Sequence, residues 1–145
     1  GVSNKIYSED FIEIKEIPTE WIKYPFFIKW LKSQKSQFDF GIAPILDSPL
    51  NRSKSYLKYL DYSALGIPGI YSNIRPYKHK ILNLKNGILA QNSTKDWYNA
   101  IEKLILNKEL RYKIAHNAVH DVRKNNLLGE HSHELYNLIN SIKRK

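Results

Sequence analysis

The sequence has 145 residues, 23 of them basic and 14 acidic, and it contains no cysteine. Its length predicts a single domain over residues 1–145. The lack of cysteine excludes disulfides and a thiol nucleophile, and it fits a reducing compartment such as the cytoplasm. The formal net charge of +9 favours an anionic partner, and no apolar run reaches the roughly 20 residues of a membrane span. The start at Gly1, without a methionine, suggests a fragment of a longer chain.

The first part of the chain predicts strands and helices in alternation. Residues 11–17 alternate apolar with charged side chains, as an edge strand does, and Pro18 ends this pattern. A helix is expected around Pro25, because the first turn of a helix tolerates proline. Residues 38–46 are mostly apolar, which favours a short parallel strand buried on both faces. The turn formers at 47–52 predict a loop after this strand.

A second helix is predicted over about residues 55–65, and Gly66 ends it. Two more short strands are expected at 68–72 and 87–90, where apolar residues follow turn formers. The chain therefore continues to alternate helix with strand up to residue 90.

The last third of the chain is predicted to be helical. Ser93 and Asp96 have the spacing of a capping box. Asn107 is placed to cap a further helix, and residues 131–145 predict a final one. The apolar stripe of the first of these helices comprises Trp97, Ile101, Leu104 and Ile105.

Strands that alternate with helices pair in parallel through crossover connections. The predicted fold class is therefore α/β, with a Rossmann-like parallel sheet between two layers of helices. In such sheets ligands bind beyond the carboxyl ends of the strands. The loop over residues 47–55 is expected at that edge.

The stretch from Asn51 to Tyr62 is the best candidate for a binding segment. At about 100° per residue, Lys54, Lys58 and Asp61 share one polar stripe of the predicted helix. Leu57, Leu60 and Ala64 form a separate apolar stripe that is expected to pack. The amino end of the helix, with its unpaired N–H groups and nearby lysines, suits a diphosphate. An equally simple interpretation is a solvated helix face with one Lys–Asp pair.

Four pieces of sequence in succession resemble the C-terminal domain of family 4 glycosyltransferases of the GT-B fold. They are DFGIAP, NRSKSYLKYLDYSALGIP, NGILA and NKELR, and the resemblance covers about residues 38–125. It implies a Rossmann-like domain that binds a nucleotide-sugar donor. It also implies that an N-terminal acceptor domain and the first strand of this domain are absent from the sequence.

The resemblance assigns roles to particular residues. Asp61 matches the acidic residue that binds the ribose of the donor, although the family more often has glutamate there. Ser53 occupies the position of the family's other glutamate and cannot take over its carboxylate role. No residue is assigned a catalytic role. The residues expected to face the donor diphosphate are Ser53, Lys54, Ser55, Tyr56, Leu57 and Lys58, and those expected to line the donor pocket are Pro44, Asn51 and Arg52.

The implied reaction is retaining transfer of a sugar from a nucleoside diphosphate to a glycan or lipid-linked acceptor. No cofactor is expected, and the lack of an Asp-x-Asp motif agrees with a transferase that needs no metal to hold its donor. The expected partners are the nucleotide sugar, the missing N-terminal domain and, by peripheral contact, the inner face of the membrane, but not nucleic acid. The alternatives are a noncatalytic basic α/β module that binds nucleic acid, and a degenerate transferase domain that binds a protein partner.

Overall fold

The computed structural model describes residues 19–126, and the chain divides into two compact units between Gln34 and Lys35. The described part of the first unit holds a short 3₁₀ helix, η1 (Thr19–Trp21), and helix α1 (Tyr24–Ser33), which has Pro25 in its first turn as predicted. The strand predicted at 11–17 and the helix predicted at 131–145 lie outside the described residues.

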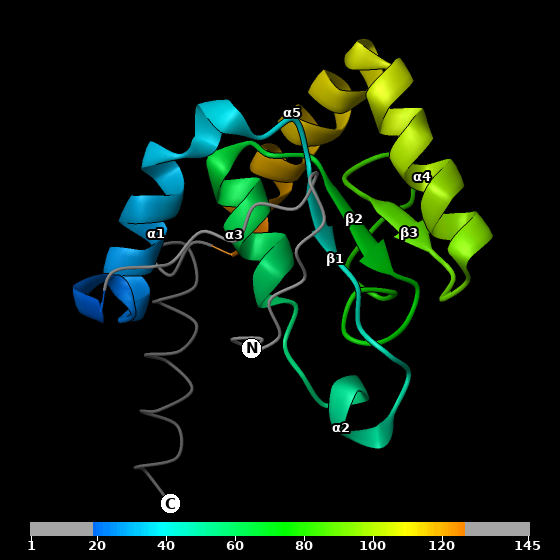
Figure 1. The fold of residues 1–145 in the computed structure, drawn as a ribbon, viewed down its shortest axis with the longest axis horizontal. Coiled ribbons are helices and arrows are strands. Elements are labelled where there is room, and N and C mark those ends of the chain that lie inside the picture. The colour runs from blue at the N-terminus through cyan, green and yellow to red at the C-terminus, as the bar shows by residue number, and fades with distance from the viewer. Residues whose placement is uncertain (1–18, 127–145) are drawn as a thin grey trace, which may run out of the picture. The chain divides into compact units, whose positions relative to one another are not determined.

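The second unit carries a parallel sheet of three strands, β1 (Gly41–Ala43), β2 (Gly69–Ser72) and β3 (Ile88–Ala90), in the order β1-β2-β3 (Figure 1). The register places Ile42, Ile70 and Ile88 side by side, and Tyr71 beside Leu89. A further 3₁₀ helix, η2 (Lys35–Gln37), precedes the sheet. The helices of this unit are α2 (Pro49–Arg52), α3 (Leu57–Leu65), α4 (Thr94–Leu106) and α5 (Lys108–Asn125). The predicted alternation of helix and strand around a parallel sheet is confirmed.

Each face of the sheet is covered by its own hydrophobic cluster. Ile70 and Ile88 pack with Ala100 and Leu104 of α4 and with Ile114 of α5. On the opposite face, a second cluster joins side chains from β1, α3, β2 and α5: it comprises Ala43, Tyr59, Tyr71, Tyr77, Ile81 and Ala118. Because successive side chains of a strand point to opposite faces, Ile70 and Tyr71 serve different clusters.

The strand prediction for residues 38–46 is wrong in length and burial. Strand β1 has three residues and pairs only with β2 among the described strands, so it lies at the edge of the described sheet. Ile42 is 47% exposed, in keeping with its place at the edge of the described sheet. Strand β2, which has a neighbour on both sides, is buried at every residue. Burial on both faces is therefore a property of β2.

The packed face of α3 also differs from the prediction. Leu57 and Ala64 are exposed and Leu60 is only partly buried, whereas Tyr59, Asp61, Ser63 and Leu65 are buried. The cause is the packing of aromatic rings, because the ring centroid of Tyr71 lies 6.0 Å from those of both Tyr59 and Tyr62. A large ring removes more apolar surface from water than a leucine does, so the tyrosines turn toward the sheet.

The predicted end of α3 and the predicted starts of α4 and α5 are confirmed. Gly66 ends α3 in the left-handed conformation, with φ at 65°. The amide of Asp96 donates to Ser93 Oγ over 3.1 Å at the start of α4, and the amide of Leu110 donates to Asn107 Oδ1 over 2.8 Å at the start of α5. The prediction that Ile105 belongs to the packed stripe of α4 is wrong, because its side chain is 59% exposed. Leu104, the residue before Ile105, is the one that points into the core at this turn.

A polar network centred on Tyr59 joins three segments of the second unit. The buried Tyr59 hydroxyl donates to Asp121 Oδ2 of α5 over 2.5 Å and accepts from Asn86 Nδ2 over 3.0 Å. Lys80 Nζ lies 3.0 Å from the same Asp121 oxygen, and Asn125 Nδ2 donates to Asp121 Oδ1 over 2.7 Å. Each member of this network has a partner, which is the condition for a buried polar group to stabilise a fold.

Replacing Tyr59 with phenylalanine removes the shared hydroxyl and leaves Asp121 and Asn86 each short of one partner. We expect Tyr59→Phe to lower the free energy of unfolding by about 1–3 kcal/mol, measured by urea denaturation. Tyr98→Phe is the matched control, because Tyr98 is exposed on α4 and its hydroxyl, among residues 19–126, bonds only Glu102. Equal losses in the two variants would contradict the role given to the network.

The same network predicts an acid dependence of stability. Burial alone raises the pKa of Asp121, but hydrogen bonds from Tyr59, Lys80 and Asn125 outweigh it and hold that pKa below its ordinary value. A carboxyl whose pKa is lower in the folded state contributes stability that is complete above the unfolded value, about pH 4, and is lost as the pH falls through the folded value. Asp121→Asn should therefore flatten the decline of the urea midpoint below about pH 4. Glu109→Gln, which removes an exposed charge from the same helix, should leave that decline unchanged.

Candidate functional site at the carboxyl edge of the sheet

Three loops leave the carboxyl ends of the strands at one edge of the sheet. Residues 44–56, which include α2, follow β1, residues 73–87 follow β2, and residues 91–93 follow β3. Because the strands are parallel, all three loops begin at the same edge, where α/β sheets bind ligands. Figure 1 shows α2 beyond this end of the strands.

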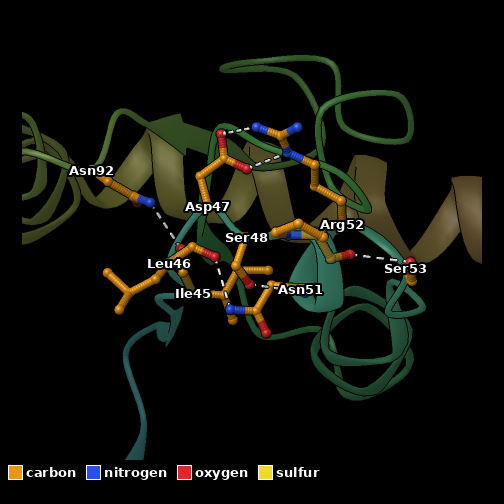
Figure 2. Close-up of polar contacts among 9 residues, drawn as sticks. Ile45, Leu46, Asp47, Ser48, Asn51, Arg52, Ser53 and Asn92 are labelled. Atoms are coloured by element: carbon orange, nitrogen blue, oxygen red, sulfur yellow. Dashed lines mark hydrogen bonds and ion pairs between the residues drawn. The ribbon is translucent and has the colours of Figure 1, made fainter.

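Hydrogen bonds tie the loop after β1 to the end of β2 and to the loop after β3. The amide of Ile45 donates to Ser72 Oγ, at the end of β2, over 2.9 Å. Asn92 Nδ2, just after β3, donates to the carbonyl of Ile45 over 2.8 Å, and Asn51 Nδ2 donates to the carbonyl of Leu46 over 2.8 Å (Figure 2). The backbone of this loop is therefore held from both sides.

The prediction of a plain loop at 47–52 is wrong, because this segment contains the four-residue helix α2. Ser48 accepts the amide of Asn51 with its side chain, and Pro49 sits in the first turn, so the helix has both a cap and a favourable start. Arg52, the last residue of this helix, reaches back to Asp47 (Figure 2).

Asp47 and Arg52 form a bidentate ion pair on the surface of this loop. Arg52 Nε lies 2.6 Å from Asp47 Oδ1, and the Arg52 Nη2 atom donates to Asp47 Oδ2 over 2.9 Å. Hydrogen bonds from the guanidinium hold the pKa of the Asp47 carboxyl below its usual range. The opposite charges of the two side chains cancel, and the two N–H donors of Arg52 that face Asp47 are both used.

Two hollows open at this edge. The first has a volume of about 270 Å³ and a mostly apolar surface; it is lined by Pro44, Ile45, Leu46, Asn92, Ser93, Thr94 and Trp97. The second has a volume of about 260 Å³, and all but one of its lining residues are polar or charged; it is lined by Asp47, Arg52, Asn73, Ile74, Arg75, Lys78 and His79. The edge thus combines an apolar recess with a cationic one.

The structure brings some of the residues predicted from the sequence into these hollows. Pro44 lines the first and Arg52 lines the second. Asn51 and Ser53 lie in the same loop but use their side chains within it, since Ser53 Oγ donates to the carbonyl of Pro49 over 3.1 Å. Neither hollow is lined by the remaining predicted residues of the segment, which are Lys54, Ser55, Tyr56, Leu57 and Lys58.

Helix α3 begins two residues later than predicted, at Leu57, with Tyr56 as its N-cap and no side-chain hydrogen bond to the cap. Lys54 and Ser55 are therefore outside the helix, in the exposed connection from α2. The expectation that the amides of Ser55 to Leu57 face a diphosphate stays a prediction.

The prediction that Asp61 is presented on a polar stripe is wrong. Its side chain is 1% exposed, and Lys58 Nζ lies 3.9 Å from Asp61 Oδ2. Burial raises the pKa of Tyr77, and the negative charge of the nearby Asp61 carboxylate raises it further. This carboxylate therefore lies close to the tyrosine cluster. Tyr59 and Tyr62, three residues apart, share one face of α3, whereas Asp61 lies about 100° from Tyr62 around the helix and is buried as well. Contact with a ribose would need this side of α3 to open.

The basic residues after β2 were not among the residues predicted from the sequence. Arg75, Lys78 and His79 line the second hollow. The signal that could have found them is the run RPYKHK at 75–80, which begins shortly after a buried strand and has no acidic residue.

Within residues 19–126, no three His, Cys, Asp or Glu side chains are grouped to hold a metal. No helix in that range is long and apolar enough to cross a membrane.

Ser72 is expected to hold the loop after β1 in place. Its hydroxyl is fully buried and accepts the amide of Ile45, so Ser72→Ala leaves that amide without its partner. We expect a loss of about 1–3 kcal/mol in the free energy of unfolding and faster hydrogen exchange at Ile45. Ser53→Ala, which removes an exposed hydroxyl from the same loop, should change neither. Protection of the Ile45 amide that survives in Ser72→Ala would refute this role.

No protein-family model matches the sequence, and no curated protein is significantly similar to it. A solved structure that is similar is the C-terminal domain of a glycosyl transferase group 1 family protein (LpcC) from Francisella tularensis. The two chains share 19% sequence identity with a TM-score of 0.58, and the match covers 77% of this chain and 51% of that one. The predicted fold class is confirmed: the chain has the Rossmann-like α/β fold found in the C-terminal half of a GT-B glycosyltransferase.

Proposed function

We propose that this chain is the donor-binding part of a glycosyltransferase that takes its sugar from a nucleoside diphosphate. The observation that carries the proposal is the pair of hollows at the carboxyl edge of a sheet whose fold is similar to a group 1 glycosyltransferase domain. This edge is where parallel α/β sheets bind their ligands.

The two hollows differ in the way that the two parts of such a donor differ. The recess beside Pro44 and Trp97 offers apolar surface, with Asn92 and Ser93 at its rim, and suits the uncharged base or sugar. The recess beside Arg52 and Arg75 offers positive charge, and suits the phosphates. Departure of a nucleoside diphosphate concentrates negative charge on its oxygens, so cations fixed near them would stabilise the transition state.

The proposed reaction needs a second surface for the acceptor. The match to the solved domain covers about half of that chain. We propose that this chain supplies one wall of a cleft. We place the acceptor, a glycan or a lipid-linked sugar, on a partner domain, and we propose transfer with retention at the anomeric carbon. Positioning of two substrates can lower a barrier by about 7–11 kcal/mol. The 145-residue chain by itself is expected to bind donor without transferring sugar.

The proposal is tested by titrating the chain with nucleoside diphosphates, nucleotide sugars and a short DNA duplex while following its backbone amide signals. We expect saturable binding of a nucleotide, with shifts at Ile45, Leu46, Asn92 and Ser93, because these residues line the first hollow. A product assay with the same donors and a panel of acceptors should show no transfer by this chain alone.

Two outcomes would contradict the proposal. Nucleotide-induced shifts of amide signals that are confined to the exposed face of α5 would place the site elsewhere. Binding of the duplex without binding of any nucleotide would favour the noncatalytic nucleic-acid module instead.

A further inference from the structure

We propose that the loop after β2, residues 73–80 and here called the β2 loop, supplies the cations that hold the donor diphosphate, through Arg75 and Lys78. This inference rests on the proposed function and moves the phosphate contact from Lys54 and Lys58 to a different segment. The hollow lined by Arg75 and Lys78 is the site.

The β2 loop carries more positive charge than it uses for folding. It contains Arg75, Lys78, His79 and Lys80 and no acidic residue. Lys80 is committed to the core network through Asp121, at 3.0 Å. Arg75 and Lys78 are exposed, and within residues 19–126 neither forms an ion pair with a carboxylate. Their charges are therefore available to a ligand.

The hollow that these side chains share is positive as a whole. Its lining has three permanent cations, Arg52, Arg75 and Lys78, against one acid, Asp47, which leaves a net charge of +2. Arg52 already neutralises Asp47 by a bidentate pair, so the acid does not compete for the other two cations. A diphosphate is anionic along its length, and a guanidinium matches phosphate oxygens in a fixed fork. A single phosphate or a carboxylate would satisfy fewer of these donors.

The backbone that carries the two cations is anchored. Tyr77 lies between them and is buried, with its ring 5.0 Å from that of Tyr71. The amides of Tyr77 and Lys78 both donate to the carbonyl of Ile74 over 2.9 Å. At the start of the loop, the amide of Asn73 donates to the carbonyl of Ala90 over 2.8 Å. Only the side chains of Arg75 and Lys78 must be ordered when an anion binds, which keeps the entropic cost low.

The lysines predicted from the sequence are less well placed for this task. Lys58 lies 3.9 Å from the Asp61 carboxylate, so its charge already has a counterion. Lys54 is exposed in the connection between α2 and α3 and lines neither hollow at the sheet edge. Two double variants that remove equal charge therefore distinguish the two assignments.

The experiment compares Arg75→Gln/Lys78→Gln with Lys54→Gln/Lys58→Gln, and uses Lys113→Gln/Lys124→Gln, at two exposed positions on α5, as a control for net charge. Each protein is titrated calorimetrically with inorganic pyrophosphate, with a nucleoside diphosphate and with the free nucleoside, at two salt concentrations. Thermal unfolding checks that each variant is folded. All the changed residues are exposed, so the fold should survive.

We expect Arg75→Gln/Lys78→Gln to bind pyrophosphate and the nucleoside diphosphate about tenfold or more weakly, with a smaller loss of affinity at high salt. Binding of the free nucleoside should be unchanged. A pyrophosphate affinity that is equal in this variant and in the unaltered chain, or a loss confined to Lys54→Gln/Lys58→Gln, would overturn the inference. Absence of any pyrophosphate binding by the unaltered chain would overturn it as well.

The proposed function fails by a different result. The chain could bind pyrophosphate through Arg75 and Lys78 but bind a nucleoside diphosphate no more tightly than pyrophosphate. That result would support the cationic site and contradict the proposal of a nucleotide donor. If the nucleotide binds at the first hollow and is insensitive to Arg75 and Lys78, the donor function stands and the β2 loop has no part in it.

Discussion

The hydroxyl of Tyr59 is the point where helix α3, the chain after β2 and helix α5 meet. It donates to Asp121 and accepts from Asn86, and Lys80 completes the network around Asp121. A buried phenol is stable only with its polar end satisfied, and its ring adds contacts to Tyr71 in the sheet. This one side chain therefore fixes both the face of α3 that packs and the far end of the β2 loop.

The site at the carboxyl edge depends on this arrangement in two ways. Strand β2 is central, and the loop that leaves it is pinned at Asn73 by β3 and at Lys80 by Asp121. The loop after β1 is held separately, through Ser72 and Asn92. A rigid frame beneath exposed cations is what a phosphate site requires, because the frame is ordered before the ligand arrives.

The placement of charge separates residues that build the fold from residues free to bind. Lys80 and Lys58 each lie beside a carboxylate in the second unit, and Arg111 donates to the carbonyls at the end of α4. Arg75 and Lys78 have no such structural task among the described residues. The excess of basic residues in the composition is thus divided, and one part of it gathers at the carboxyl edge of the sheet.

Local chemistry determined the elements that short-range interactions control. The capping of α4 by Ser93 and of α5 by Asn107, the end of α3 at Gly66 and the parallel order of strands could all be predicted from the sequence, since each depends on neighbours within a few residues or on the alternation of helix and strand. The inward face of α3, the burial of Asp61 and the grouping of Arg75 with Arg52 could not. They were decided by the packing of Tyr59 and Tyr62 on Tyr71 and by loops that meet only when the strands align, and periodicity along one helix contains no information about such distant partners.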